Sequence, residues 1–151
     1  MLLYLVRHGK AEAGADDAAR RLTREGSSAV QRMAQLLTDS GIKVERIEHS
    51  GLVRAAETAS ILAEAVDGKS TKVGGLGPSD NVASAAARLS GCSERSIMLV
   101  GHIPFMERLA SYLLTGDADT SLLHFRASAI ACLSNGEGHW LLEWFLAPAL
   151  A

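Results

Sequence analysis

The chain has 151 residues, a formal net charge of −2 at pH 7 and 48% hydrophobic residues. A chain of this length forms one domain with a sizeable core, and its balanced charge gives no support for nucleic-acid or membrane-surface binding. No apolar run approaches the roughly 20 residues that span a bilayer, and the N-terminus lacks the features of a signal peptide. We therefore expect a single cytoplasmic domain over residues 1–151, present as a monomer without a membrane partner.

The first dozen residues contain an apolar run, Leu2 to Val6, that stops abruptly at Arg7-His8-Gly9. Such a run is typical of a short strand buried on both faces, with the chain turning at Gly9. Arg7 and His8 then lie at the carboxyl end of the strand, where open α/β sheets bind ligands. An arginine holds an anion in a planar fork, and a neutral imidazole beside it can attack phosphorus or accept a proton.

Helices and strands alternate after this opening strand. Apolar spacing and capping residues predict a loop over residues 13–20, a Thr23-capped helix from Arg24 to Ser40-Gly41, a strand over Val44–His49, a helix from Val53 or Arg54 to Asp67-Gly68, a brief strand at Thr71–Val73, a helix capped by Ser79 or Asp80, a strand over Ser96–Val100 and a helix with Pro104 at its first position. Arg54 thus lies in the first turn of a helix, just beyond a strand, where free backbone N–H groups suit an anion.

The strand that ends at Val100 is followed by Gly101-His102, which repeats the construction of the first strand. Further on, Leu122–Leu133 and Trp140–Leu146 flank an Asn-Gly-Glu-Gly sequence, which indicates a hairpin. Strands that alternate with helices and finish in a hairpin predict an α/β fold. We expect a three-layer α/β/α sandwich with a mostly parallel central sheet and an antiparallel C-terminal hairpin.

Four polar residues therefore lie at, or just beyond, the carboxyl ends of predicted strands: Arg7, His8, Arg54 and His102. Each alone has a plainer explanation, as a solvated loop start, a surface helix residue or a helix cap. Together they form a compact cationic pocket that suits a phosphoryl group.

A metal site is a poorer explanation of the same residues. The histidines lack HxH or HExxH spacing, and the neighbouring arginines repel cations. Cys92 and Cys132 have no metal spacing and are expected to be free, buried thiols. We expect neither a metal nor a cofactor.

Several motifs resemble, in order, those of the histidine phosphatase superfamily, which includes the phosphoglycerate-mutase-like enzymes. Arg7-His8-Gly9 looks like its Arg-His-Gly signature, and Val100-Gly101-His102 resembles its second-histidine element. Ser50 to Ala59 resembles its Ser-Pro-Leu-x-Arg-Ala-x-x-Thr-Ala element, with Gly51 in place of the proline. Arg21 to Gly26 resembles its Pro-Leu-Thr-x-x-Gly element, with arginine in place of the proline. The order and spacing match across nearly the whole chain.

The resemblance implies a phosphoglycerate-mutase-like fold and, because the chain is short, a narrower class. Larger members insert a segment with an acidic residue that protonates the leaving group, whereas here that region is the brief loop Gly74–Asn81. The chain looks most like the SixA-type phosphohistidine phosphatases. That branch acts on a phosphorylated histidine in the phosphotransfer domain of a signalling kinase, so the implied partner is such a domain.

The hypothesis for the mechanism is that His8 attacks phosphorus, forms a phosphohistidine intermediate and is released by water. Arg7 and Arg54 lower the pKa of His8 and, with His102, hold the phosphoryl oxygens. A carbonyl near Gly9 is expected to accept a hydrogen bond from one ring nitrogen of His8 and so leave the other free to attack.

Other residues near this turn are weaker candidates. Gly9 and Arg20 could contribute to substrate binding, and Asp80 or Glu12 could serve as the general acid. A missing acid fits a phosphoramidate, because an imidazole leaves more easily than an alkoxide. Two alternatives remain: a phosphatase for a small phosphorylated metabolite, with Asp80 or Glu12 as acid, and an inactive module that binds phosphoryl groups or a partner.

Overall fold

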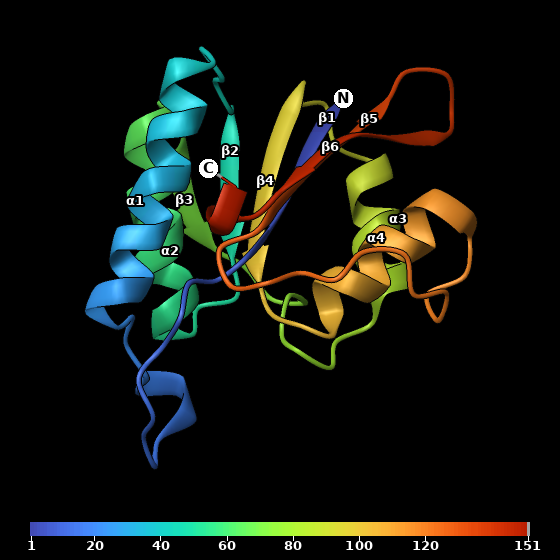
Figure 1. The fold of residues 1–151 in the computed structure, drawn as a ribbon. Coiled ribbons are helices and arrows are strands. Elements are labelled where there is room, and N and C mark those ends of the chain that lie inside the picture. Colours follow the sequence, from blue (N-terminus) through green and yellow to red (C-terminus); the bar gives the residue numbers. More distant parts are fainter. Residues whose placement is uncertain (151) are drawn as a thin grey trace.

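A mixed sheet of six strands, in the order β3-β2-β4-β1-β5-β6, runs through the computed structural model, which describes residues 1–150 (Figure 1). The strands are β1 (Leu2–Arg7), β2 (Arg46–His49), β3 (Lys69–Lys72), β4 (Ser96–Gly101), β5 (Ile130–Asn135) and β6 (Trp140–Leu146). Strands β1 to β4 pair in parallel, whereas β5 and β6 form an antiparallel hairpin on β1. The predicted mostly parallel sheet with a C-terminal hairpin is confirmed.

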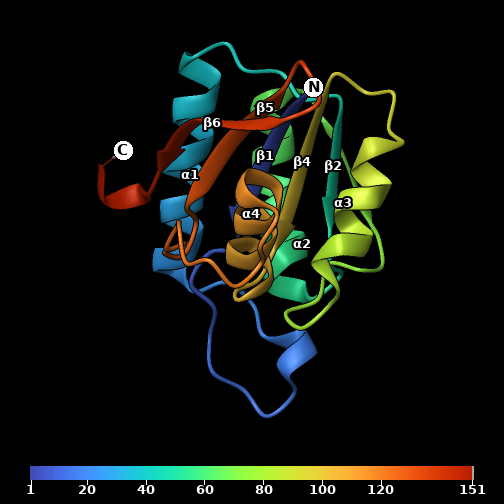
Figure 2. The same cartoon turned by 90° about the vertical axis from the view of Figure 1, so that its right-hand side faces the viewer.

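Two pairs of helices cover the two faces of the sheet (Figures 1 and 2). Helices α1 (Arg24–Asp39) and α2 (Val53–Val66) pack on one face, and α3 (Val82–Ser90) and α4 (Phe105–Thr115) pack on the other. Short 3-10 turns, η1 (Asp17–Ala19) and η2 (Pro148–Leu150), complete the chain. This arrangement is the predicted three-layer α/β/α sandwich.

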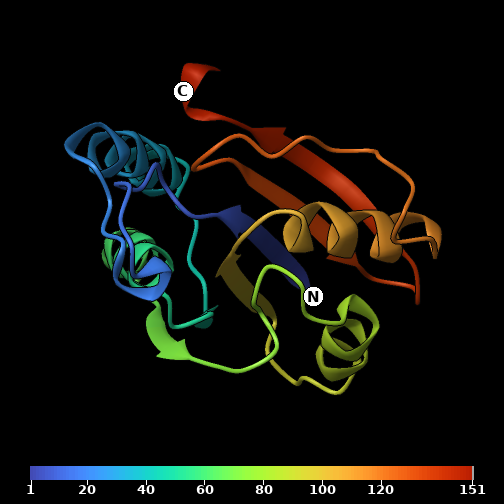
Figure 3. The ribbon, with the colours of Figure 1, turned by 90° about the horizontal axis from the view of Figure 1, so that it is seen from below.

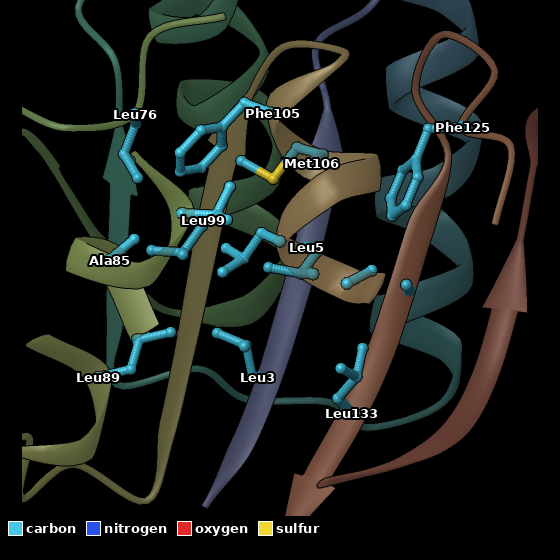
Figure 4. Packing of buried hydrophobic residues seen from close by; sticks show 14 of the residues in the cluster. Leu3, Leu5, Leu76, Ala85, Leu89, Leu99, Phe105, Met106, Phe125 and Leu133 are labelled. Carbon is cyan, nitrogen blue, oxygen red and sulfur yellow. The ribbon is translucent and has the colours of Figure 1, made fainter. Parts of the chain in front are cut away.

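Strand β1 lies in the middle of the sheet and contributes to both cores. Leu3 and Leu5 point toward α3 and α4, where they pack with Leu99 and Met106 (Figure 4). The alternate side chains of β1 join the core under α1 and α2. Burying one large aliphatic side chain contributes about 1.5–3 kcal/mol, so β1 is firmly anchored. This anchoring fixes the position of the Arg7-His8 turn that follows the strand.

Local signals explain the helix nearest this turn. The Thr23 side chain accepts a hydrogen bond from the Gly26 N–H at 2.9 Å, which caps α1 as predicted. The apolar face of α1 is buried under the sheet, and its members are spaced as one helical stripe: Val30, Met33, Ala34 and Leu37.

Several predicted boundaries were wrong. Strand β2 begins at Arg46 rather than Val44, and β3 covers Lys69–Lys72 rather than Thr71–Val73. Helix α3 is capped by Asn81, whose side chain accepts from the Ser84 N–H, and not by Ser79 or Asp80. The Asp80 carboxylate accepts instead from the Gly77 N–H at 2.7 Å, within the preceding loop.

The segment before the hairpin also differs from its prediction. Residues 122–129 form no regular structure, and β5 begins only at Ile130, after a turn at which Ser128 has a positive φ of 66° that interrupts an extended chain. Pro104 is the N-cap of α4 rather than its first helical residue. Among residues 1–150, no helix is long and apolar enough to cross a membrane.

Candidate active site

The carboxyl ends of β1 and β4 bring the two predicted histidines together, at the edge seen from below in Figure 3. Arg7 pairs with Gly101 in the parallel register of these strands. His8 and His102 are the next residues along, so they leave the sheet side by side. Their ring centroids are 5.0 Å apart. Arg54, in the first turn of α2, reaches His8 with a distance of 3.3 Å between its Nε and the Nε2 of His8. The residues that the sequence predicts to cluster therefore lie close together in the structure.

His8 is held in one tautomer. Its Nδ1 lies 2.7 Å from the Gly9 carbonyl oxygen, which can only accept, so Nδ1 carries the proton and Nε2 keeps a free electron pair. The Nε–H of Arg54 points at that pair. Burial lowers the pKa of His8 to about 4, opposed by the Gly9 carbonyl and assisted by the charges of Arg54, Arg7 and Arg20. The ring is therefore neutral near pH 7, with Nε2 as its nucleophilic atom.

Arg54 is bound to the loop that carries η1. Its side chain is only 6% exposed, and it donates to the Asp17 carbonyl oxygen at 2.8 Å and to the Asp17 carboxylate at 3.3 Å. The Asp17 side chain is 65% exposed, and its pKa is lowered by its hydrogen bond to Arg20 and by the charge of Arg54. An ionised carboxylate thus lies against the guanidinium that was predicted to hold a phosphoryl group.

His102 is almost completely buried, with 2% of its surface exposed. Its Nε2 lies 2.6 Å from the Ser50 hydroxyl, which also accepts from the Leu52 N–H at 3.4 Å. Burial, followed by the charges of His8 and Arg54, lowers the pKa of His102 to about 3. The Ser50 oxygen has a second lone pair, so this contact is compatible with either neutral tautomer of His102. The buried Nδ1 has no hydrogen-bond partner within residues 1–150.

Arg7 is oriented by the irregular segment before β5. Its Nη1 donates to the Phe125 carbonyl oxygen at 2.9 Å, and the Phe125 N–H donates to the Glu107 carboxylate at 3.0 Å. Burial lowers the pKa of Arg7, and the nearby charge of Glu107 opposes this effect. No pattern in the sequence predicts a role for Phe125 or Glu107, since neither belongs to a motif and the Arg7–Phe125 contact joins positions 118 residues apart.

Thr58 links the two halves of the cluster and was not singled out from the sequence. Its fully buried hydroxyl accepts from the Gly9 N–H at 3.0 Å and donates to the Arg54 carbonyl at 2.7 Å. Thr58 follows Arg54 by four residues, so the two share one face of α2. This spacing, within the motif from Ser50 to Ala59, was the available signal for its role.

The weaker candidates lie at different distances from the cluster. Arg20 lies at the rim, where its Nε donates to the Glu12 carbonyl and its Nη1 to the Asp17 carboxylate. Within residues 1–150, no hydrogen bond or ion pair joins the side chain of Glu12 or Asp80 to the four clustered residues. Gly9 has no room for a side chain, because a Cβ there would lie 2.8 Å from a methyl carbon of Val30.

The functional groups at this edge of the sheet are therefore two guanidinium groups and two neutral imidazole rings. Guanidinium groups bind tetrahedral oxyanions, and a neutral imidazole nitrogen can form a bond to phosphorus. The part of the chain that the structure describes holds no group of three or more His, Cys, Asp or Glu side chains that could bind a metal ion.

Comparison with known proteins gives consistent matches. A family model described as histidine phosphatase superfamily (branch 1) matches residues 3–76. An uncharacterized protein of Picosynechococcus sp. is 34% identical over 97% of this chain and 94% of its own length. The phosphohistidine phosphatase SixA of Escherichia coli (strain K12) is 26% identical over 98% of this chain and 94% of its own length.

A solved structure of the protein histidine phosphatase SixA, complexed with tungstate, has the same fold. It superposes with a TM-score of 0.90 and 26% sequence identity, and the match covers 99% of both chains. The similarity therefore extends over the whole domain, including the segments before and after residues 3–76.

Proposed function

The chain belongs to the histidine phosphatase superfamily, in its SixA-type branch, and on this basis we propose that it dephosphorylates a phosphohistidine of a signalling phosphotransfer protein. That it is a phosphatase follows from the family. The choice of phosphohistidine as the substrate is supported by the similarity to SixA and by the side chains around His8. The observation that carries the proposal is the neutral His8 ring, whose unprotonated Nε2 accepts a hydrogen bond from the Arg54 Nε–H at 3.3 Å.

In the proposed reaction, His8 Nε2 attacks the phosphorus atom as the P–N bond of the substrate breaks. The substrate ring carries a proton on its other nitrogen, so the electron pair of the P–N bond goes to the departing nitrogen and the imidazole leaves as a neutral ring. Water then attacks the phosphorus of phospho-His8, the His8 Nε2–P bond breaks, and inorganic phosphate is released. Burial supports this role, because it keeps His8 neutral and so ready to attack.

Arg7, Arg54 and His102 are proposed to hold the phosphoryl oxygens while charge spreads over them in the transition state. Two of these side chains are already oriented by fixed groups, since Arg7 is bonded to a backbone carbonyl and His102 to Ser50. Pre-oriented donors need no rearrangement during the reaction. Removing one such donor typically lowers the rate by about 10²–10³-fold.

The loop over residues 74–81 supports a leaving group that needs little acid assistance. Leu76 anchors this loop in the core (Figure 4), and the Asp80 carboxylate is engaged in a turn with the Gly77 N–H. An alkoxide leaving from a phosphomonoester requires a proton donor, whereas an imidazole is a better leaving group. These contacts favour a phosphoramidate over a metabolite phosphomonoester.

The test is the dephosphorylation of a phosphohistidine-bearing phosphotransfer domain, beside a panel of phosphomonoesters, without added metal. Wild type should remove the phosphoryl group of the protein rapidly and hydrolyse the esters slowly. His8→Ala should be inactive, and His139→Ala, an exposed histidine in the β5–β6 hairpin, is the matched control that should stay fully active. Rapid quenching of wild type should also yield an acid-labile phosphoryl group on His8.

Two outcomes would overturn this proposal. A preference for an ester would make the protein a metabolite phosphatase and would direct attention to Asp80 and Glu12 as acids. Equal inactivity of wild type and His8→Ala on every substrate would make the cluster a phosphoryl-binding site without turnover.

A further inference from the structure

Gly51 departs from the motif that its surroundings resemble, and the structure shows what this departure makes room for. The residue has a φ of +90°, a backbone conformation that favours glycine. It directly follows Ser50, whose hydroxyl bonds His102. The turn at Gly51 is therefore one residue away from a side chain of the active site.

The side chain of Lys72 fills the space beside Gly51. A Cβ added to Gly51 would lie 2.4, 2.7 and 3.0 Å from the Cε, Cδ and Cγ atoms of Lys72. Lys72 is the last residue of β3 and pairs with His49 at the end of β2. Its aliphatic stem therefore lies against the Ser50-Gly51 turn at the same edge of the sheet as the active site.

The ammonium group of Lys72 is an exposed positive charge at this rim. Lys10 and Lys43 form ion pairs with Glu25 and Asp67, whereas no carboxylate within residues 1–150 pairs with Lys72. Its charge acts on its surroundings, since it adds to burial in lowering the pKa of His49. A lysine whose stem is packed loses less side-chain entropy when its ammonium binds a partner.

We propose that Lys72 is a specificity-determining residue that binds a carboxylate on the phosphoprotein substrate, beside the phosphohistidine. This inference rests on the proposed function and names one recognition contact within it. The phosphoryl group itself is assigned to Arg7, Arg54 and His102, and the Ser50-Gly51 turn lies between them and Lys72. The carboxylate bound by Lys72 therefore belongs to the protein around the phosphohistidine.

The test compares Lys72→Met with Lys69→Met on two substrates. Lys69 is a matched control, because it is an exposed lysine at the opposite end of the same strand. We expect Lys72→Met to raise KM for a phosphohistidine-bearing phosphotransfer domain by about 3- to 10-fold at low ionic strength, with kcat unchanged. Lys69→Met should leave KM unchanged, and Lys72→Arg should restore most of it. Hydrolysis of free phosphoramidate, which has no neighbouring carboxylate, should be the same in all variants.

Failure of the inference is distinguishable from failure of the proposed function. If wild type is active on the phosphoprotein and Lys72→Met has the same KM as Lys69→Met, Lys72 does not recognise the substrate. If Lys72→Met loses activity equally on phosphoramidate, Lys72 acts on the phosphoryl group or on the fold, and the inference is also overturned. If wild type is inert on the phosphoprotein yet hydrolyses esters, the proposed function fails and this inference fails with it.

Discussion

Replacing Thr58 with valine should remove two hydrogen bonds and leave the shape of the core intact. Threonine and valine have nearly the same volume, and Thr58 is completely buried. The Gly9 N–H would lose its acceptor inside the protein, and an unsatisfied buried donor costs about 1–3 kcal/mol. The Arg54 carbonyl stays in the hydrogen-bond ladder of α2, so the loss of its second partner adds little.

Thermal and urea unfolding measure the stability part of this prediction. For a domain of this size, each kcal/mol lowers Tm by roughly 2–4 °C, so the valine variant should unfold about 2–12 °C lower. Its kcat should fall by about 10–100-fold, because Gly9 also supplies the carbonyl that fixes the His8 tautomer. Thr58→Ser keeps the hydroxyl and loses one methyl group, so it should cost about 1 kcal/mol and retain wild-type kcat.

Comparing the two variants shows whether the hydroxyl group or the methyl group of Thr58 supports the site. A valine variant as stable and as active as wild type would refute the role of the hydroxyl. A serine variant with lower kcat than the valine variant would show that the methyl packing of Thr58, and not its hydrogen bonds, supports the site.

Three further predictions follow from the contacts around the site and the sheet. Asp17→Asn removes the carboxylate that competes for Arg54, so tungstate or phosphate should inhibit this variant at several-fold lower concentration than wild type; equal inhibition constants would contradict the competition. The pKa values of His8 and His102 are lowered to about 4 and about 3, so below pH 6.5 the unfolded chain binds more protons than the folded chain. The stability that these two groups contribute should therefore be fully present above pH 6.5 and be lost as the pH falls toward their folded pKa values. Urea unfolding at several pH values should show this loss, and the loss should be smaller in His102→Gln. Glu48→Gln should lower stability by about 1–3 kcal/mol in urea unfolding, because this buried carboxylate neutralises two arginines, and an unchanged midpoint would contradict that view.

The elements that could be predicted from the sequence are those with a local signal. The apolar run of β1 stops at Arg7-His8, and the stripe on α1 follows a Thr23 cap, so pattern alone places both elements. Because parallel strands end at one edge, the sequence also predicts that Arg54 and His102 lie near His8, and the structure brings them together.

The contacts that could not be predicted depend on the paths of irregular segments. Arg54 donates to the Asp17 carbonyl, 37 positions away, and Arg7 donates to the Phe125 carbonyl, 118 positions away. No periodicity in the sequence predicts either hydrogen bond. The prediction for the low pKa of His8 named the arginines, whereas burial is the largest cause, and depth of burial is not visible in a sequence. The cap of α3 was misplaced because Asp80 and Asn81 are both good capping residues and only the path of the turn at Gly77 selects between them.

The central place of β1 has a consequence for how the protein is made. Strand β1 is synthesised before the other strands of the sheet, yet its two neighbours, β4 and β5, begin only at Ser96 and Ile130. At a synthesis rate of about 5–20 residues per second, the first strand waits roughly 5–25 s for its partners. Pairings between such distant positions also form slowly once the chain is complete. A nascent chain therefore carries His8 long before the sheet can orient it, and the apolar run beside His8 stays available to chaperones until β5 has been synthesised.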